Sequence, residues 1–265
     1  MTEEEEKKFE WKHEDWVRKL TKQAEESREY RHKLYNKVGL RDKKKILDVG
    51  CGTGAVTFDL ARSTNGHVIG IDIDSEKLEE ARKLLGPLSN LELLEADAQD
   101  LPFEDETFDL VVFTIVLMYV PDKQKAVNEM ARVTKKGGHV LAVMEPDNAG
   151  TIEYPPTPTR ALMLKAMEEL NADLETGRKL KFLFNTAGLR TECGIETETD
   201  YILIKDDAKR TEMVKNQLWI YEKLLRADGW AEEDIEKYTK ELVENTAKGL
   251  TFHFQPVMYA VGEKV

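Results

Sequence analysis

The chain has 265 residues, of which 41% are hydrophobic and 34% are charged, and its formal net charge at pH 7 is −12. This length suffices for one substantial core. No apolar run approaches the roughly 20 residues that span a bilayer, and the acidic start is unlike a signal peptide. These two features predict a cytoplasmic protein without a membrane span. The negative charge disfavours duplex nucleic acid and other polyanions as partners.

The first forty residues predict a helical cap on the main domain. Residues 3–38 are almost free of glycine and proline and are rich in Glu, Lys and Arg. Two interpretations are open for this segment. Trp11 and Trp16 can pack on the main domain, and Arg28 and Arg31, which lie close before the next strand, can instead close over a bound cofactor.

Residues 44–143 alternate between strand and helix patterns. Strands are expected at 46–49, 67–72, 91–96, 108–113 and 139–144, and helices at 55–62, 76–85 and 122–133, with Ser75 as the cap of the second. Such alternation predicts a parallel sheet with right-handed crossovers and helices on both faces.

The pattern changes after residue 144. A proline-rich connector at 154–158 is followed by predicted helices at 160–170, 178–186, 208–226 and 231–247 and predicted strands at 192–204 and 251–261. The helical pair before the last strand is longer than a minimal sheet domain needs, so these segments are predicted insertions.

A glycine-rich turn follows the first strand of the sheet. Gly50, Gly52 and Gly54 occupy every second position and lead directly into a helix that begins at Ala55. Glycines at this spacing let the backbone turn tightly and present its N–H groups to a ligand at close range. The turn therefore predicts a cofactor site.

Two classes of cofactor fit the turn. Gly50, Gly52 and Ala55 satisfy the dinucleotide pattern G-x-G-x-x-G/A, and Asp72 ends the second strand, where a carboxylate can bind ribose hydroxyls. Asp48 and Gly54 extend the pattern to D-x-G-x-G-x-G. With these residues the sequence resembles the class I S-adenosylmethionine-dependent methyltransferases, and among them the ubiquinone/menaquinone-type and general small-molecule group.

The resemblance continues along the predicted sheet in family order. The matching stretches are Leu47–Gly54, Ile69–Asp74, Glu95–Ala98 with Leu101–Phe103, Phe108–Val112 with Thr114–Tyr119, and Lys136–Leu141. It implies a doubly wound α/β fold, Rossmann-like, with a seven-stranded, mostly parallel sheet whose final strand is antiparallel. The predicted single domain divides into a cap (1–40), a cofactor-binding core (41–150), an acceptor-side lid with insertions (151–250) and the final strand (251–265).

The resemblance also implies S-adenosylmethionine as the cofactor. In it, Asp72 would hold the ribose, Ile73 would pack on adenine and Asp97 would accept from the exocyclic amine. The predicted cofactor-binding residues are Arg31, Asp48, Gly50, Cys51, Gly52, Gly54, Asp72, Ile73, Asp97, Ala98 and Thr114. Structural alternatives remain open: Asp48 can cap N–H groups at the strand end, and Asp97 can hydrogen-bond within its loop. Cys51 is predicted to fill the turn, not to act as a nucleophile.

Methyl transfer needs alignment of the acceptor and exclusion of water more than a conspicuous catalytic motif. Candidates are therefore sought where the fourth and fifth strands end. Tyr119 and Glu145 are the predicted catalytic residues, Tyr119 lining the acceptor side and Glu145 acting as general base or binding a cationic substrate. Asp147 can serve the same purpose or cap the following turn, and His253 is predicted to be a histidine at the edge of the core.

Two other functions remain open. Tyr119 and Lys123 have the Tyr-x-x-x-Lys spacing of short-chain dehydrogenases, but Pro121 lies between them, which argues against an NAD(P)-dependent oxidoreductase. A non-catalytic S-adenosylmethionine-binding module is the other alternative. The predicted acceptor is a small molecule that the sequence does not identify. The two cysteines and five histidines predict no metal site, and nothing indicates the oligomeric state.

Overall fold

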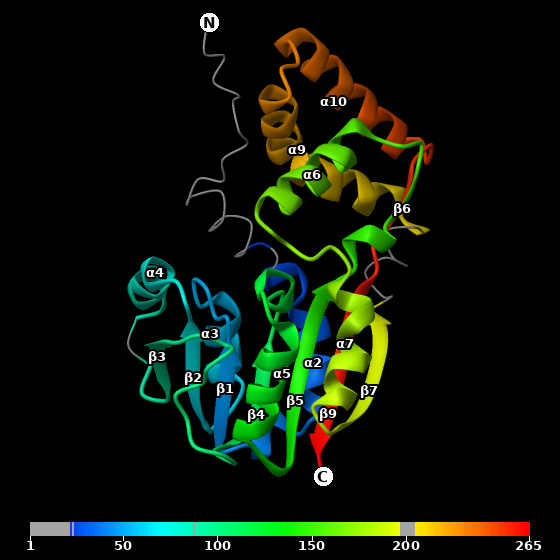
Figure 1. The fold of residues 1–265 in the computed structure, drawn as a ribbon. Coiled ribbons are helices and arrows are strands. Elements are labelled where there is room, and N and C mark those ends of the chain that lie inside the picture. Colours follow the sequence, from blue (N-terminus) through cyan, green and yellow to red (C-terminus); the bar gives the residue numbers. More distant parts are fainter. Residues whose placement is uncertain (1–21, 23, 87, 197–204) are drawn as a thin grey trace, which may run out of the picture. The chain divides into compact units, whose positions relative to one another are not determined.

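The computed structural model describes residues 22, 24–86, 88–196 and 205–265, and the chain forms two compact units (Figure 1). The sheet unit contains the described residues up to Asp147 together with Glu175–Glu196 and Val257–Val265. The helical unit contains Asn148–Leu174 and residues 205–256. Trp11, Trp16 and much of the predicted N-terminal cap lie outside the described residues, as does the part of the predicted strand 192–204 beyond Glu196.

The sheet unit is built on seven strands in the order β3-β2-β1-β4-β5-β9-β7. The strands are β1 (Lys45–Val49), β2 (His67–Asp72), β3 (Leu91–Glu95), β4 (Phe108–Phe113), β5 (Thr134–Pro146), β7 (Leu189–Glu196) and β9 (Val257–Lys264). The first five pair in parallel, and β9 is antiparallel to both β5 and β7. This confirms the predicted mostly parallel sheet with an antiparallel final strand.

Aspartate side chains cap two of the helices in the sheet unit. The helices are α2 (Arg28–Lys37), α3 (Ala55–Arg62), α4 (Ser75–Leu85), α5 (Lys123–Val133) and α7 (Thr176–Thr186), with 3₁₀ turns η1 (Leu40–Asp42) and η2 (Leu117–Tyr119). Asp122 caps α5 by accepting from the Lys125 N–H at 2.9 Å. The cap of α4 is Asp74, which accepts from two backbone N–H groups, so the prediction of Ser75 as the cap was wrong.

The core lies on both faces of the sheet. In β1, Ile46 packs with residues of α2 and α3, whereas Leu47 and Val49 pack with residues of α5 and α7. The side chains of β4 divide between the same two layers, and Leu110 and Val111 are both fully buried. Helices on both faces explain why these strands are nearly continuous apolar runs.

The helical unit contains a second, two-stranded sheet that the sequence did not predict. Its elements are η3 (Asn148–Gly150), β6 (Ile152–Tyr154), α6 (Pro158–Glu169), α9 (Asp207–Ala227), α10 (Glu232–Ala247) and β8 (Phe252–Phe254). β6 and β8 pair antiparallel. The final strand predicted to start at residue 251 is therefore two strands, because Pro256 lacks the N–H needed to continue a ladder and separates β8 from β9.

Among the described residues, no helix combines the length and the apolar character that crossing a bilayer requires.

Candidate active site

The glycine turn connects β1 to α3 at the carboxyl edge of the sheet. Its three glycines have positive φ angles, 70° at Gly50, 54° at Gly52 and 80° at Gly54. A Cβ atom added to Gly50 would lie 2.5 Å from a methyl carbon of Val116, which follows β4. Since both the backbone conformation and the space exclude a side chain, only glycine fits at this position.

Asp72, the last residue of β2, holds the turn from the side. Its Oδ2 accepts a hydrogen bond from the Gly52 N–H at 2.8 Å, and its Oδ1 accepts from the Asp74 N–H at 3.0 Å. The Cys51 N–H donates to the Ile71 carbonyl at 2.8 Å, which also fixes the turn to β2. A carboxylate oxygen has two lone pairs, so each Asp72 oxygen retains capacity for a ligand hydroxyl.

Asp48 lies beneath the turn and is buried, with 2% of its surface exposed. Its Oδ2 accepts from the Thr57 hydroxyl at 2.6 Å. Burial raises the pKa of Asp48 to about 7, although the Thr57 hydrogen bond and the charge of Arg31 act in the opposite direction. Burial likewise raises the pKa of the Cys51 thiol, which disfavours the thiolate and supports the interpretation of Cys51 as a filler of the turn.

Ile73 and Asp97 follow the ends of β2 and β3. The Ile73 side chain is 69% exposed, an unusual place for a large apolar group directly after a buried carboxylate. Asp97 accepts from the backbone N–H of Gln99 at 2.8 Å and from its side-chain amide at 3.2 Å. The structure thus contains the hydrogen bonds within the loop that the sequence left as one option for Asp97. The adenine contacts of Asp97 and of the half-buried Ala98 remain predictions.

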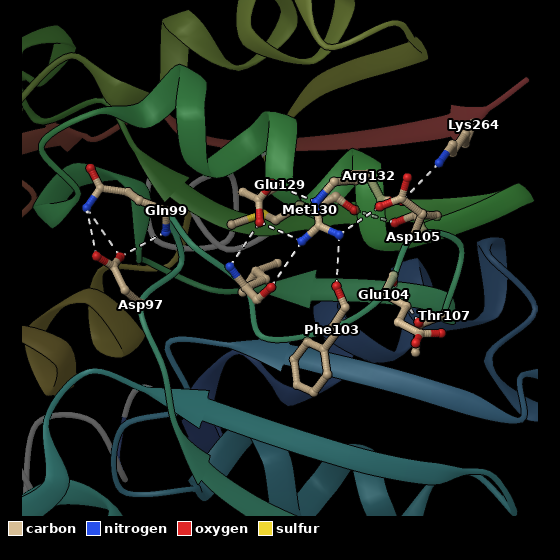
Figure 2. A network of polar contacts seen from close by, with 12 residues as sticks. Asp97, Gln99, Phe103, Glu104, Asp105, Thr107, Glu129, Met130, Arg132 and Lys264 are labelled. Carbon is tan, nitrogen blue, oxygen red and sulfur yellow. Dashed lines mark hydrogen bonds and ion pairs between the residues drawn. The ribbon is translucent and has the colours of Figure 1, made fainter.

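The loop between β3 and β4, which carries Asp97, is fastened to α5 by Arg132 (Figure 2). The Arg132 guanidinium donates to the Leu101 carbonyl at 3.0 Å and to the Phe103 carbonyl at 2.8 Å. Glu129 pairs with Arg132 at 2.7 Å and accepts from the Leu101 N–H at 2.9 Å. Sequence reasoning missed this pair, and its only signal was the i, i+3 spacing of opposite charges on a predicted helix.

We expect Arg132→Gln to lower the free energy of unfolding by about 1–2 kcal/mol, because it frees the loop and leaves Glu129 without its charge partner. The side chain is 31% exposed, which limits the effect. Urea unfolding measures it, with Arg190→Gln as the matched control. Arg190 pairs with Glu263 on the surface and is 70% exposed, so its loss should cost less than about 0.5 kcal/mol. Equal losses in both variants would contradict a role for Arg132 in holding the loop.

Arg31 is buried in α2 and binds protein groups. Its guanidinium donates to the Ala24 carbonyl and the Ser27 hydroxyl, both at 2.6 Å, and to Asp59 of α3 at 3.0 Å. Arg28 binds the same Asp59 carboxylate at 3.0 Å. The structure therefore brings both arginines to α3, and a direct contact between Arg31 and a cofactor remains a prediction.

Glu145, in β5, is fully buried beneath the loop that follows β4. Its Oε1 accepts from the Val116 N–H at 2.8 Å, and burial raises its pKa to about 8 against the effect of the loop N–H groups. Thr114 has a buried hydroxyl with no hydrogen-bond partner among the described residues. Tyr119, in η2, is 39% exposed. This placement suits Glu145 for positioning the loop, and the catalytic roles of Tyr119 and Glu145 remain predictions.

We expect Glu145→Gln to flatten the pH dependence of stability. The Glu145 pKa rises from 4.5 to about 8 on folding, so between these values the folded chain binds a proton that the unfolded chain lacks. The free energy of unfolding of the wild type should therefore fall as the pH rises through this window, by up to about 1.4 kcal/mol per unit. Urea unfolding at pH 5, 6, 7 and 8 should show the variant gaining on the wild type toward pH 8. If the free energies of unfolding of the wild type and of Glu145→Gln change with pH in parallel, Glu145 does not have the raised pKa.

Asp147 follows β5 and faces the start of α7. It accepts from the Arg178 N–H at 3.2 Å and from the Arg178 guanidinium at 2.6 Å. These contacts join the end of β5 to α7, and both sequence alternatives for Asp147, a group at the acceptor or a cap of the following turn, remain predictions.

Comparisons with known proteins agree with this geometry. A family model described as "Methyltransferase domain" matches residues 40–211. Demethylmenaquinone methyltransferase of Staphylococcus aureus is 38% identical over 121 residues, which are 45% of this chain and 50% of that protein. The chain spans about half the length of the curated relatives it matches.

Solved structures share the fold. Phosphoethanolamine N-methyltransferase 2 of Haemonchus contortus, in complex with S-adenosyl-L-methionine, superposes with a TM-score of 0.60 at 15% identity, covering 89% of this chain and 52% of that one. The YcgJ protein of Bacillus subtilis superposes with a TM-score of 0.55 at 18% identity, covering 90% and 99%. With the family model matching well over half of the sequence, the chain belongs to the methyltransferase domain family.

Proposed function

We propose that this protein transfers a methyl group from S-adenosylmethionine to a small-molecule acceptor. One observation carries the proposal: the glycine turn, the Asp72 carboxylate and the exposed Ile73 side chain meet at the carboxyl edge of β1 and β2. Ligands of open α/β sheets bind at this edge. Membership of the methyltransferase domain family favours S-adenosylmethionine over a dinucleotide.

The residues at this edge fit S-adenosylmethionine chemically. Asp72 offers oxygen acceptors for ribose hydroxyls, and Ile73 offers an exposed apolar surface for adenine. The turn at Gly50 has no room for a side chain, so its backbone is open to close approach by a ligand. The buried hydroxyl of Thr114, which has no partner among the described residues, is a further group that a ligand would satisfy.

When bound, S-adenosylmethionine supplies a methyl carbon activated by its sulfonium. The protein's residues then bind, orient and exclude water. Glu145 fixes the loop that carries Val116 and Tyr119 through the hydrogen bond from the Val116 N–H. Tyr119 is 39% exposed, and its partial burial together with the charge of Glu145 raises its pKa to about 12, so its hydroxyl stays protonated and can donate to an acceptor.

A quinone-like ring is the acceptor class that we favour. The Staphylococcus aureus relative is a demethylmenaquinone methyltransferase, and the segment that it shares with this chain is 38% identical.

Transfer of label from S-adenosylmethionine to acceptors in a cell extract tests the proposal. We expect label in a low-molecular-weight product when the purified full chain is added, and none with Gly50→Ala. Label in protein or nucleic acid alone would contradict a small-molecule acceptor. Binding of S-adenosylmethionine without transfer to any fraction would favour a non-catalytic binding module.

A further inference from the structure

Two buried polar groups lie without a hydrogen-bond partner at neighbouring strand ends of the sheet unit. Glu145, near the end of β5, is fully buried, and its Oε2 has no partner among the described residues. Thr114, the residue after β4, has a buried hydroxyl that likewise finds no partner in the described part of the chain. Because a buried polar group without a partner costs free energy, a ligand that pairs with both groups would be stabilised here.

Backbone hydrogen bonds join both groups to the same loop. β4 and β5 are neighbouring parallel strands (Figure 1). Beyond the end of β4, the Ile115 N–H donates to the Met144 carbonyl at 3.1 Å, and the Val116 N–H donates to Glu145 Oε1 at 2.8 Å. The Thr114 hydroxyl and the Glu145 carboxyl group therefore belong to one short stretch at the carboxyl edge of the sheet.

This loop adjoins the glycine turn. A methyl carbon of Val116 would lie only 2.5 Å from a Cβ atom added to Gly50. Ile115, which precedes Val116, has a φ of 57°, a conformation that β-branched residues rarely adopt. Backbone strain of this kind gathers at ligand-binding sites. The loop that joins the two unpartnered groups is thus in contact with the turn at which we propose that S-adenosylmethionine binds.

The Glu145 carboxyl group lacks a counter-charge. No ion pair reaches it among the described residues, and the groups that lower its pKa are backbone N–H groups of the loop. Burial outweighs them and raises the pKa to about 8, because nothing with a positive charge stabilises the carboxylate. An ammonium group at Oε2 would supply that charge together with N–H donors for Oε2 and for the Thr114 hydroxyl oxygen.

S-adenosylmethionine carries an ammonium group on its methionine half, whereas the quinone-like acceptor that we favour carries no cation. We propose that Glu145 Oε2 and the Thr114 hydroxyl bind the ammonium group of the methionine half of S-adenosylmethionine. Both oxygens accept from its N–H donors, and the bond to the carboxylate is charge-assisted. The inference rests on the proposed methyl-transfer function, and it gives Glu145 a role other than that of a base.

Three ligands separate this contact from the rest of the cofactor site. S-adenosylmethionine and S-adenosylhomocysteine both carry the ammonium group, and 5′-methylthioadenosine has the adenosine and the sulfur but no amino-acid part. Glu145→Gln keeps an acceptor for the Val116 N–H and loses the charge. In calorimetry on the full chain it should bind the first two ligands at least about tenfold more weakly, and 5′-methylthioadenosine within about twofold of the wild type. Thr114→Val should weaken the first two about fivefold.

Asp109→Asn is the matched control, because it removes a carboxylate near the opposite end of β4, where Asp109 accepts from the Lys44 and Lys45 N–H groups. It should bind all three ligands within about twofold of the wild type. Two results for Glu145→Gln would overturn the inference alone: unchanged binding of all three ligands, or an equal loss for all three, which would indicate a structural role in the loop. If the wild type binds none of the three, the proposed function and this inference fail together.

Discussion

Replacement of Gly50 by alanine is expected to reduce S-adenosylmethionine affinity by more than about 100-fold, or about 2.7 kcal/mol. The added Cβ would lie 2.5 Å from Val116, and the φ of +70° is strained for any L side chain. The turn must therefore move, and it carries both the Gly52 N–H held by Asp72 and the backbone that we propose approaches the cofactor. Isothermal titration calorimetry measures the loss.

Gly137 provides the matched control for this experiment. Its φ of +74° is close to that of Gly50, but a Cβ added there meets nothing within 4 Å. Gly137→Ala should therefore share the cost of backbone strain, about 1 kcal/mol in the free energy of unfolding, and leave S-adenosylmethionine affinity unchanged. If both variants bind S-adenosylmethionine as the wild type does, the glycine turn is not the cofactor site.

Replacement of Asp72 by alanine is the second large effect, with an expected loss in S-adenosylmethionine affinity of about 100-fold. The substitution removes the acceptor of the Gly52 N–H and the proposed acceptor of the ribose hydroxyls, each a charge-assisted hydrogen bond. Asp72→Asn keeps one carbonyl oxygen and should lose less, about tenfold. Calorimetry with S-adenosylmethionine and with S-adenosylhomocysteine gives both values.

Asp74→Asn is the control for Asp72. Asp74 lies two residues further on and caps α4 through the N–H groups of Glu76 and Lys77, and asparagine is an equally good cap. Its S-adenosylmethionine affinity should stay within about twofold of the wild type. If Asp74→Asn loses as much S-adenosylmethionine affinity as Asp72→Asn, the loss comes from removing negative charge at this end of β2. That result would contradict a specific role for Asp72.

The alternation of strand and helix from residue 44 to residue 143 was enough to predict the sheet, because helices on both faces make each strand a distinct apolar run. The break in the last predicted strand was not foreseen. Phe252 and Phe254 alternate, and so do Val257, Tyr259 and Val261, with a spacing of three between the two sets. Neither set reveals that β8 pairs with β6 while β9 pairs with β5 and β7. Strand partners far apart in sequence are set by tertiary packing.

The site was predictable where a residue's type restricts what it can do. Alternate glycines between a strand and a helix favour a tight turn, a carboxylate at a strand end favours contact with N–H or hydroxyl groups, and both lie where expected. The environments of charged side chains were not predictable. The sequence predicts Glu145 as a candidate base, and in the structure it is fully buried under the Val116 N–H. The burial of a charged side chain such as Glu145 is a property of the folded chain.

Calorimetric titration of the wild-type protein with S-adenosylmethionine, S-adenosylhomocysteine, NAD and NADP tests the central claim most directly. We predict one saturable site for the first two ligands, lost in Gly50→Ala and retained in Gly137→Ala, and no binding of either dinucleotide. Binding of NAD or NADP together with no response to S-adenosylmethionine or S-adenosylhomocysteine would contradict the proposed function.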